Sequence, residues 1–409
     1  MFCCSVRINR ESIDDAMNNA SNKLPQSNRR DFLTGKSAIR SWQSNVAVPL
    51  QTINAQGVRT GEPDSSVGIS PQHQRQAAYL EQYSKNAMAC EFEFFFNLHQ
   101  YRQSATSAMS AFQLIDELEE QMSVYRAHSE ISTINRLAAD KEVPVEPTMF
   151  ELLLVAKELY EQTASAFDIT SGALTKLWRF DRRAGVLPTQ LAIDEILRFV
   201  GSNQVQLDSR SNTIRFAQRG IEINLGGIGK GHALDRVAAL FRRAQINDFM
   251  IHGGQSSVLA AGTSTEIEPG PDYGGWRVGL THPTLPGVRL AEITLRNQAL
   301  GTSGTARQGF FHQGQWFGHI IDPRTGWPTS HFLSTTVITG SAARADALAT
   351  AFYVLNLDEI LGYCEQHPEV GVILVSKQPV GEIESSGQPA TGHVLIQTIN
   401  LVESSFQVC

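Results

Sequence analysis

The chain has 409 residues, of which 42% are apolar, so it is long enough to bury one large hydrophobic core or two ordinary ones. Its formal net charge of -7, with no basic run to offset it, argues against general nucleic-acid binding. Its five cysteines are scattered and odd in number, which fits neither a disulfide framework nor a zinc site.

Residues 1–80 are rich in Asn, Gln, Ser and charged side chains without a sustained apolar period, so we expect a polar, largely irregular extension. Within it, Arg29 and Arg30 lie in a stretch similar to a twin-arginine export signal. The residues that follow contain no apolar segment of the length that such a signal needs. No run of the sequence is long enough for a transmembrane segment. We therefore expect a cytoplasmic protein, with export as the alternative.

The remaining chain alternates between strand and helix patterns. These predict a strand over 87–97, a helix over 105–123, a short helix capped by Ser129, a helix over 148–163, a hairpin over 204–216, and strands over 249–262, 276–280 and 290–295. Residues 299–304 place Thr302 and Ser303 between glycines, as in a loop that approaches a ligand closely. The mixture predicts an α+β fold.

The segment 166–172 breaks the helical period and places an acid and hydroxyls between apolar neighbours. Asp168 and Thr170 are its notable pair. They either cap the helix that we expect over 173–180 or contact a ligand, and the residue types do not decide between these interpretations.

The stretch 223–241 joins a glycine-rich turn to an apolar helix face. Gly226, Gly227, Gly229 and Gly231 leave backbone amides unshielded, and Lys230 adds a cation, so a phosphate could approach a helix N-terminus here. The sequence matches neither a P-loop, which needs Ser or Thr after Gly-Lys, nor the G-x-G-x-x-G dinucleotide motif. A glycine-rich packing turn is the alternative.

Two further segments contain residues suited to chemistry. Residues 319–326 read as the end of an apolar strand, beginning at His319, that runs into a Pro-Arg-Thr-Gly turn. Residues 341–355 have a helical composition with Ser341 as candidate cap, and Asp346 and Thr350 stand one turn apart on one face. Such a pair is usually a solvated stripe, but carboxylate and hydroxyl oxygens are also ligands that Mg²⁺ accepts.

Five motifs, in this order along the chain, resemble the ApbE family of FAD:protein FMN transferases. They are Ser129-Glu-Ile-Ser-Thr-Ile-Asn135, Ala166-Phe-Asp-Ile-Thr170, Asn224-Leu-Gly-Gly-Ile-Gly-Lys-Gly231, His319-Ile-Ile-Asp-Pro-Arg-Thr-Gly326 and Asp346-Ala-Leu-Ala-Thr350. The resemblance covers roughly residues 83–377. It implies one α+β catalytic domain over 81–380 with intertwined halves, followed by a tail over 381–409 that packs on it or is partly irregular.

The resemblance implies Mg²⁺-dependent cleavage of the FAD pyrophosphate, transfer of FMN to a threonine hydroxyl of an acceptor protein, and release of AMP. Asp346 and Thr350 would hold the metal with a backbone carbonyl near Gly227. His319 would act as base towards the incoming hydroxyl, or would only position its loop. The FAD pocket would be lined by Met88, Tyr125, Ala166, Phe167, Asp168, Asn224, Lys230, Ile320 and Ile321.

The sequence departs from the family close to this chemistry. Asn224 stands where members usually carry Asp, Gln255 and the serines after it stand where Glu and a following Arg are usual, and Met88-Ala89-Cys90 replaces Met-Gly-Thr. Two alternatives therefore stay beside the transferase: an FAD pyrophosphatase, and an FAD-binding or regulatory protein on the same fold. A nicotinamide oxidoreductase is disfavoured, because the glycine spacing is wrong for a dinucleotide fold.

Overall fold

The computed structural model of the protein describes residues 50–54, 57–59, 80–180, 187–264, 274–305, 308–377 and 394–409. Most of the predicted 1–80 extension, including Arg29 and Arg30, lies outside the described residues. Two short strands, β1 and β2, fall within this extension, and two more, β17 and β18, fall within the predicted 381–409 tail. The boundaries of the catalytic domain stay a prediction.

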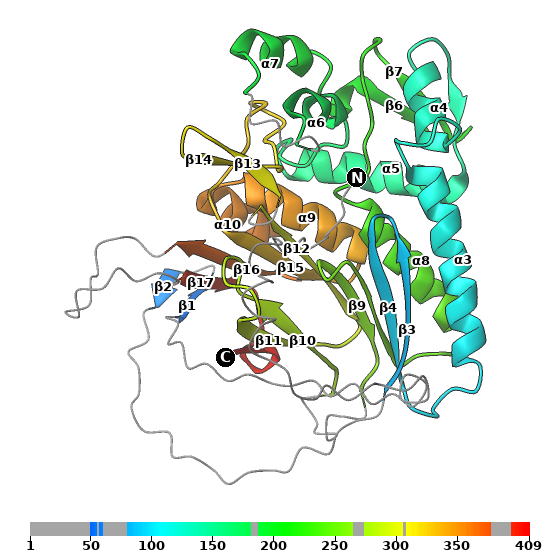
Figure 1. The fold of residues 1–409 in the computed structure, drawn as a ribbon, viewed down its shortest axis with the longest axis vertical. Coiled ribbons are helices and arrows are strands. Elements are labelled where there is room, and N and C mark those ends of the chain that lie inside the picture. The colour runs from blue at the N-terminus through cyan, green and yellow to red at the C-terminus, as the bar shows by residue number, and fades with distance from the viewer. Residues whose placement is uncertain are drawn as a thin grey trace, which may run out of the picture.

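One ten-stranded sheet organises the molecule (Figure 1). Neighbouring strands in it are antiparallel except for the parallel pair β1 and β17. In spatial order the strands are β2 (Gly57–Arg59), β1 (Leu50–Asn54), β17 (Val394–Ile399), β16 (Gly371–Lys377), β15 (Ser334–Thr339), β12 (Gln298–Gly304), β9 (Ser257–Ala261), β8 (Phe249–Gly253), β4 (Cys90–Asn97) and β3 (Leu80–Ala87). Segments far apart in the sequence thus meet at its centre.

Helices cover one face of this sheet, and a small sheet covers the other. The described helices are α3 (Ser104–Met122), α4 (Glu130–Leu137), α5 (Pro147–Gln162), α6 (Gly172–Trp178), α7 (Gln190–Leu197), α8 (Gly229–Arg243), α9 (Ala342–Val354) and α10 (Leu357–Gln366). The small sheets are β10 (Trp276–Thr281), β11 (Arg289–Leu295) and β18 (Phe406–Val408); β13 (Gly309–His312) and β14 (Gln315–Gly318); and β5 (Val143–Pro144), β7 (Thr213–Phe216) and β6 (Val205–Asp208).

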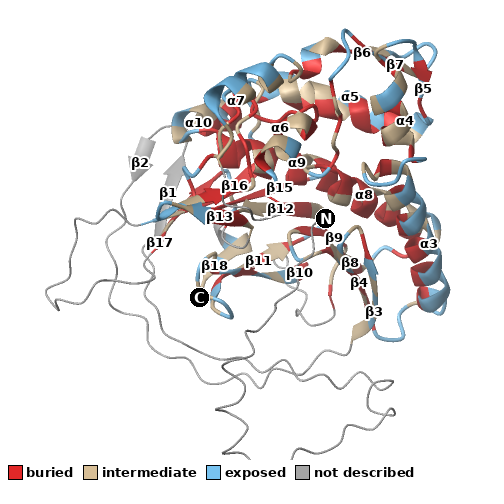
Figure 2. Ribbon diagram, turned by 45° about the horizontal axis from the view of Figure 1, so that its top comes forward, coloured by how far each residue is buried: buried red, intermediate tan, exposed pale blue. Residues whose placement is uncertain are grey.

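Burial follows this layering (Figure 2). Alternate residues of β8 face opposite sides of the sheet: Phe249 and Ile251 pack in the core beneath the helices, and Met250 packs against the core beneath β10 and β11. The helix α9 is buried over almost its whole length and lies against β12 and β15. A residue on the α9 face towards the sheet therefore sits in a low-dielectric interior.

Most of the predicted elements are present. Ser129 caps α4 by accepting a hydrogen bond from the Ser132 backbone N–H at 3.0 Å, and Ser341 caps α9 in the same way through Arg344 at 3.3 Å. Two predictions were wrong. Residues 299–304 belong to strand β12, because β9 and β15 pair with both of its edges. The strand expected to begin at His319 does not form: the preceding strand β14 ends at Gly318, and Ile321 makes an isolated bridge to Pro328.

Candidate active site

The first turn of α8 meets the middle of α9, and this contact places Asp346. The Asp346 Oδ2 atom accepts hydrogen bonds from the Gly231 backbone N–H at 2.8 Å and from the Ser257 hydroxyl at 2.9 Å. Gly231 permits the approach, since a Cβ at this residue would stand 2.0 Å from the Ala342 carbonyl oxygen. The N-terminus of α8 therefore binds a carboxylate of the protein itself, that of Asp346.

Burial dominates the electrostatics of Asp346. Desolvation raises the pKa of its carboxyl to about 6, although Lys230 and the two hydrogen bonds act in the opposite direction. The group is thus ionised at neutral pH but costly to keep charged without a bound cation. A buried carboxylate in this condition favours cation binding.

Thr350 lies one turn after Asp346 and faces the glycine turn. Its hydroxyl donates to the Asp346 backbone carbonyl at 3.0 Å and lies 3.2 Å from the Ser303 hydroxyl on β12. A Cβ at Gly227 would stand 3.6 Å from Thr350 Oγ1, so the predicted residues Gly227, Asp346 and Thr350 come together. Their oxygen atoms are the kind of ligand that Mg²⁺ accepts, with water and phosphate completing its shell.

The described residues contain no cluster of three or more His, Cys, Asp or Glu side chains suited to a metal. A site built on Asp346 therefore has at most two such side chains among the described residues, and its remaining oxygen ligands would be neutral or would belong to a substrate. This donor set fits Mg²⁺, which binds through few protein carboxylates together with phosphates, better than it fits a zinc site.

Lys230, in the first turn of α8, is the central cation. Its ammonium donates to the Ser256 hydroxyl. Burial raises the pKa of Asp346 and of Cys90 and lowers that of His319, and in all three cases the Lys230 charge acts to lower the pKa. Lys230 therefore lies within electrostatic range of each of these groups, which come from α9, the segment after β14 and β4. A positive charge in this position would attract a phosphate.

His319 is half-buried, and burial lowers its pKa to about 4. Its Nδ1 lies 3.3 Å from the Gln308 carbonyl oxygen. Since a carbonyl only accepts, Nδ1 carries the proton in this contact, and the basic nitrogen of the neutral ring is Nε2. At this pKa the ring is neutral at pH 7 but accepts protons weakly; negative charge on a bound phosphate would raise its basicity.

The segment around His319 is held by aromatic and aliphatic packing. Ile321 is buried with Trp178, and the Trp178 indole N–H donates to the Gly326 carbonyl at 2.9 Å. Ile320 is buried in the main core instead. The predicted Ile320 and Ile321 thus fix the segment on both sides, and any contact with FAD stays a prediction.

The segment 166–168 is buried, and its acid is occupied locally. Asp168 Oδ1 accepts from the Thr170 backbone N–H, the Thr170 hydroxyl and the Ser202 hydroxyl at 2.6–2.8 Å. These bonds give Asp168 a structural role within its own loop, but the predicted capping was wrong, because the N-cap of α6 is Ser171 and α6 has no side-chain cap. Phe167 lies beside the glycine turn, since a Cβ at Gly227 would stand 3.2 Å from its ring, and Ala166 is buried in the same core.

Asn224 begins the glycine turn. Its backbone N–H donates to the Ile169 carbonyl at 2.7 Å, and its side-chain Oδ1 accepts from the Gly226 N–H at 2.9 Å. The amide therefore stabilises the turn, and an Asp oxygen could make the same bond. The structure links the 166–172 segment to the glycine turn through this residue.

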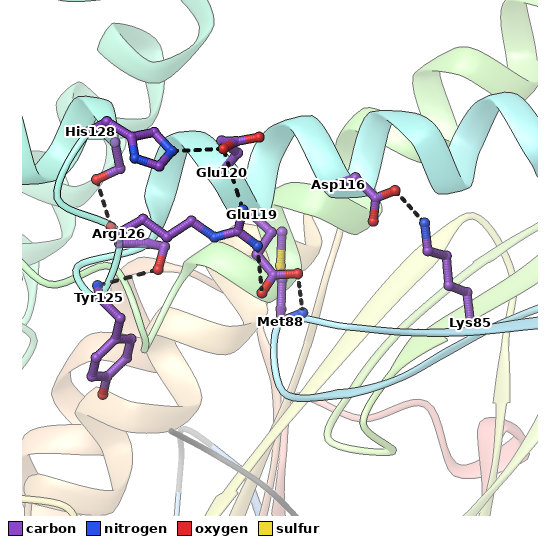
Figure 3. Close-up of polar contacts among 10 residues, drawn as sticks. Lys85, Met88, Asp116, Glu119, Glu120, Tyr125, Arg126 and His128 are labelled. Carbon is purple, nitrogen blue, oxygen red and sulfur yellow. Dashed lines mark hydrogen bonds and ion pairs between the residues drawn. The ribbon is translucent and has the colours of Figure 1, made fainter.

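Met88 and Tyr125 lie near the C-terminal end of α3 (Figure 3). The Met88 backbone N–H donates to Glu119 Oε2 at 2.9 Å, and Arg126 lies 3.8 Å from the other Glu119 oxygen. The Tyr125 ring is 71% exposed and points away from these contacts. Met88 and Ala89 form the β3–β4 turn with φ of 48° and 58°, so Ala89 has a backbone conformation that glycine adopts more easily.

Several residues of the site escaped the sequence-based prediction. Ser256 contacts Lys230, Ser257 contacts Asp346, and Asp235 accepts from the Ala342 and Ala343 N–H groups at 2.9 and 3.0 Å. Ser303, which the sequence had singled out, contacts Thr350. Asp235 therefore fixes α9 on α8. The unusual Gln-Ser-Ser sequence after Gly254 was the signal that could have identified the first two serines.

Comparisons with known proteins show which family and fold this chain resembles. The model of the ApbE family matches residues 88–374. A Klebsiella pneumoniae protein named FAD:protein FMN transferase is 30% identical over 68% of this chain and 84% of its own, and one of the same name from Haemophilus influenzae is 29% identical over 67% and 79%. The structure of "Flavin Transferase ApbE from Vibrio cholerae" superposes with a TM-score of 0.63 at 26% identity, covering 73% of this chain and 95% of that one.

The ApbE structure from Thermotoga maritima gives a TM-score of 0.64 at 25% identity over 72% of this chain and 94% of its own. The predicted α+β class is thus confirmed in a fold shared with ApbE proteins. Among the described residues no helix is both long and apolar enough to cross a membrane. The family match, the relatives named as transferases and the shared fold together lead to one conclusion: this chain belongs to the ApbE family.

Proposed function

We propose that this protein is a Mg²⁺-dependent FAD:protein FMN transferase that cleaves the FAD pyrophosphate, transfers FMN to a threonine hydroxyl of an acceptor protein and releases AMP. The observation that carries the proposal is the meeting of Asp346, Thr350 and Gly227 beside the Lys230 ammonium. One carboxylate, neutral oxygens and a cation suit a magnesium pyrophosphate. The transferase names of the related proteins support the same reaction.

Each group has a defined part in this reaction. Asp346, Thr350 and the Gly227 carbonyl would hold Mg²⁺, which when bound acts as a Lewis acid on pyrophosphate oxygens. Lys230 binds and orients the phosphates. His319 takes the proton of the acceptor threonine at Nε2 or positions that hydroxyl. Met88, Tyr125, Ala166, Phe167, Asp168, Asn224, Ile320 and Ile321 stay proposed for the FAD pocket.

The test is the release of AMP and FMN from FAD in the presence of Mg²⁺. EDTA and an Asp346→Ala variant should both abolish release, and flavin should appear on an acceptor that carries the target threonine. AMP release that persists in EDTA and in the variant would contradict the proposal. FMN release without transfer to any acceptor would instead make the protein an FAD pyrophosphatase.

An FAD-binding protein without turnover is the second candidate, because Asn224 and Gln255 are neutral. The Asn224 amide is already engaged with Gly226, and Gln255 is exposed with a φ of 62°. This candidate requires bound FAD without AMP release. Recovery of AMP release by Asn224→Asp would then assign the loss to that amide.

A further inference from the structure

Two adjacent serines where β9 begins contact the two opposite charges of the site. Ser257 is fully buried and donates from its hydroxyl to Asp346 Oδ2 at 2.9 Å. Ser256 is half-buried in the turn before β9 and accepts from the Lys230 ammonium. The two serines are adjacent in the chain, so one short segment reaches both groups.

The hydrogen bonds to Asp346 are unequally distributed between its two oxygens. Both the Gly231 N–H and the Ser257 hydroxyl bond to Oδ2. No residue in the part of the chain that the structure describes donates to Oδ1. The two donors therefore fix the rotation of the carboxylate and leave Oδ1 as its ligand atom. Groups that orient a metal ligand in this way affect metal affinity without touching the metal.

The Ser256 contact acts on the cation. In an ion pair with Asp346, the Lys230 ammonium would neutralise the carboxylate and would itself be neutralised towards a phosphate. Among the described residues Lys230 instead bonds to the Ser256 hydroxyl, a neutral acceptor. Lys230 still lies close enough to Asp346 to influence its charge. The serine therefore holds the cation near the carboxylate while leaving both charges available.

We propose that Ser257 is a positioning residue for the metal-binding carboxylate and that Ser256 is a positioning residue for the phosphate-binding lysine. The assignment rests on the roles proposed above for Asp346 and Lys230. It predicts a separation of phenotypes between two neighbouring residues of the same size and chemistry. Loss of the Ser257 hydroxyl weakens the cation site, and loss of the Ser256 hydroxyl weakens FAD binding.

The experiment uses the full chain with Mn²⁺ as probe ion, measured by electron paramagnetic resonance, and FAD binding measured by fluorescence in EDTA. Ser257→Ala should raise the Kd for Mn²⁺ by about tenfold, the lower end for lost ligand-orienting contacts, and should leave FAD affinity unchanged. Ser256→Ala should leave the Kd for Mn²⁺ unchanged and raise that for FAD by about tenfold, as for one lost hydrogen bond to a charged group. Each variant is the control for the other.

The outcomes separate this assignment from the function on which it rests. Wild-type affinities in both variants, or equal loss of both ligands in each, would overturn the division between the serines. A wild-type protein that does not bind Mn²⁺ would refute the metal role of Asp346 and the role of Ser257 with it. If Ser257→Ala fails to fold, Ser257→Cys fills a similar volume with a weak donor and should show the same Mn²⁺ phenotype.

Discussion

Gly231 in the first turn of α8 donates its backbone N–H to Asp346 in the middle of α9, across 2.8 Å. This one bond joins the glycine turn to the helix that carries the proposed metal ligands. It forms because the residue has no Cβ, and a side chain there would collide with the Ala342 carbonyl. The activity of the site and the packing of α8 on α9 are therefore linked through the same contact.

Replacing Gly231 with Ala should destabilise the protein by about 3 kcal/mol or more, because the new Cβ would be 2.0 Å from backbone atoms that cannot rotate away. Thermal or urea unfolding measures the change. Gly362→Ala in α10 is the matched control: a Cβ there meets nothing within 4 Å, so this variant should gain roughly 0.5–1 kcal/mol. An unchanged stability of Gly231→Ala would show that α8 and α9 can separate at little cost.

Asp346→Asn should abolish AMP release while stabilising the metal-free protein at pH 7.5. The folded pKa of about 6 lies above the ordinary aspartate pKa of 3.8, so the stability that this group contributes is present at low pH and lost as pH rises through 6. The amide lacks that cost, which is about 3 kcal/mol at most for a pKa raised from 3.8 to about 6. Thermal unfolding in EDTA checks the gain, and a lower melting temperature than wild type would contradict it.

Lys230→Gln should raise the KM for FAD by about tenfold or more, because a hydrogen bond between the lysine ammonium and a phosphate contributes roughly 1.5–3 kcal/mol to binding. It should also raise the pKa of Asp346, since the Lys230 charge now lowers it. The acid limb of the pH–rate profile should consequently move to higher pH. A profile that stays in place while KM rises would separate phosphate binding from any effect on Asp346.

His232 should make the protein less stable below neutral pH. Burial, helped by Arg236, lowers its folded pKa to about 4 from an ordinary 6.5. Between these values the unfolded chain binds more protons, so stability rises with pH across this window. From pH 7 to pH 5 the loss amounts to about 2 kcal/mol.

Denaturant unfolding at both pH values tests this prediction. His232→Gln should show a smaller loss of stability on acidification than wild type, while the loss due to His319, whose pKa is lowered in the same direction, remains in both proteins. An equal pH dependence in wild type and variant would exclude His232 as the source.

Local patterns in the sequence were sufficient for the helix that carries Asp346 and Thr350, because their spacing and the Ser341 cap depend only on neighbouring residues. The motif order also identified the family and its α+β class. Local patterns failed at β12, where glycines and hydroxyls resembled a loop, because pairing with β9 and β15 decided its conformation.

The sequence by itself thus determined the family, the main helices and which side chains are candidates for catalysis or binding. Only the tertiary structure showed that Asp168 is satisfied by Thr170 and Ser202, that Ser257 holds Asp346, and that Ser256 holds Lys230. The separation between Ser257 and Asp346 along the chain is 89 residues. Contacts of this kind arise from sheet order and helix packing, which no local spacing encodes, and they set the burial that raises the pKa of Asp346.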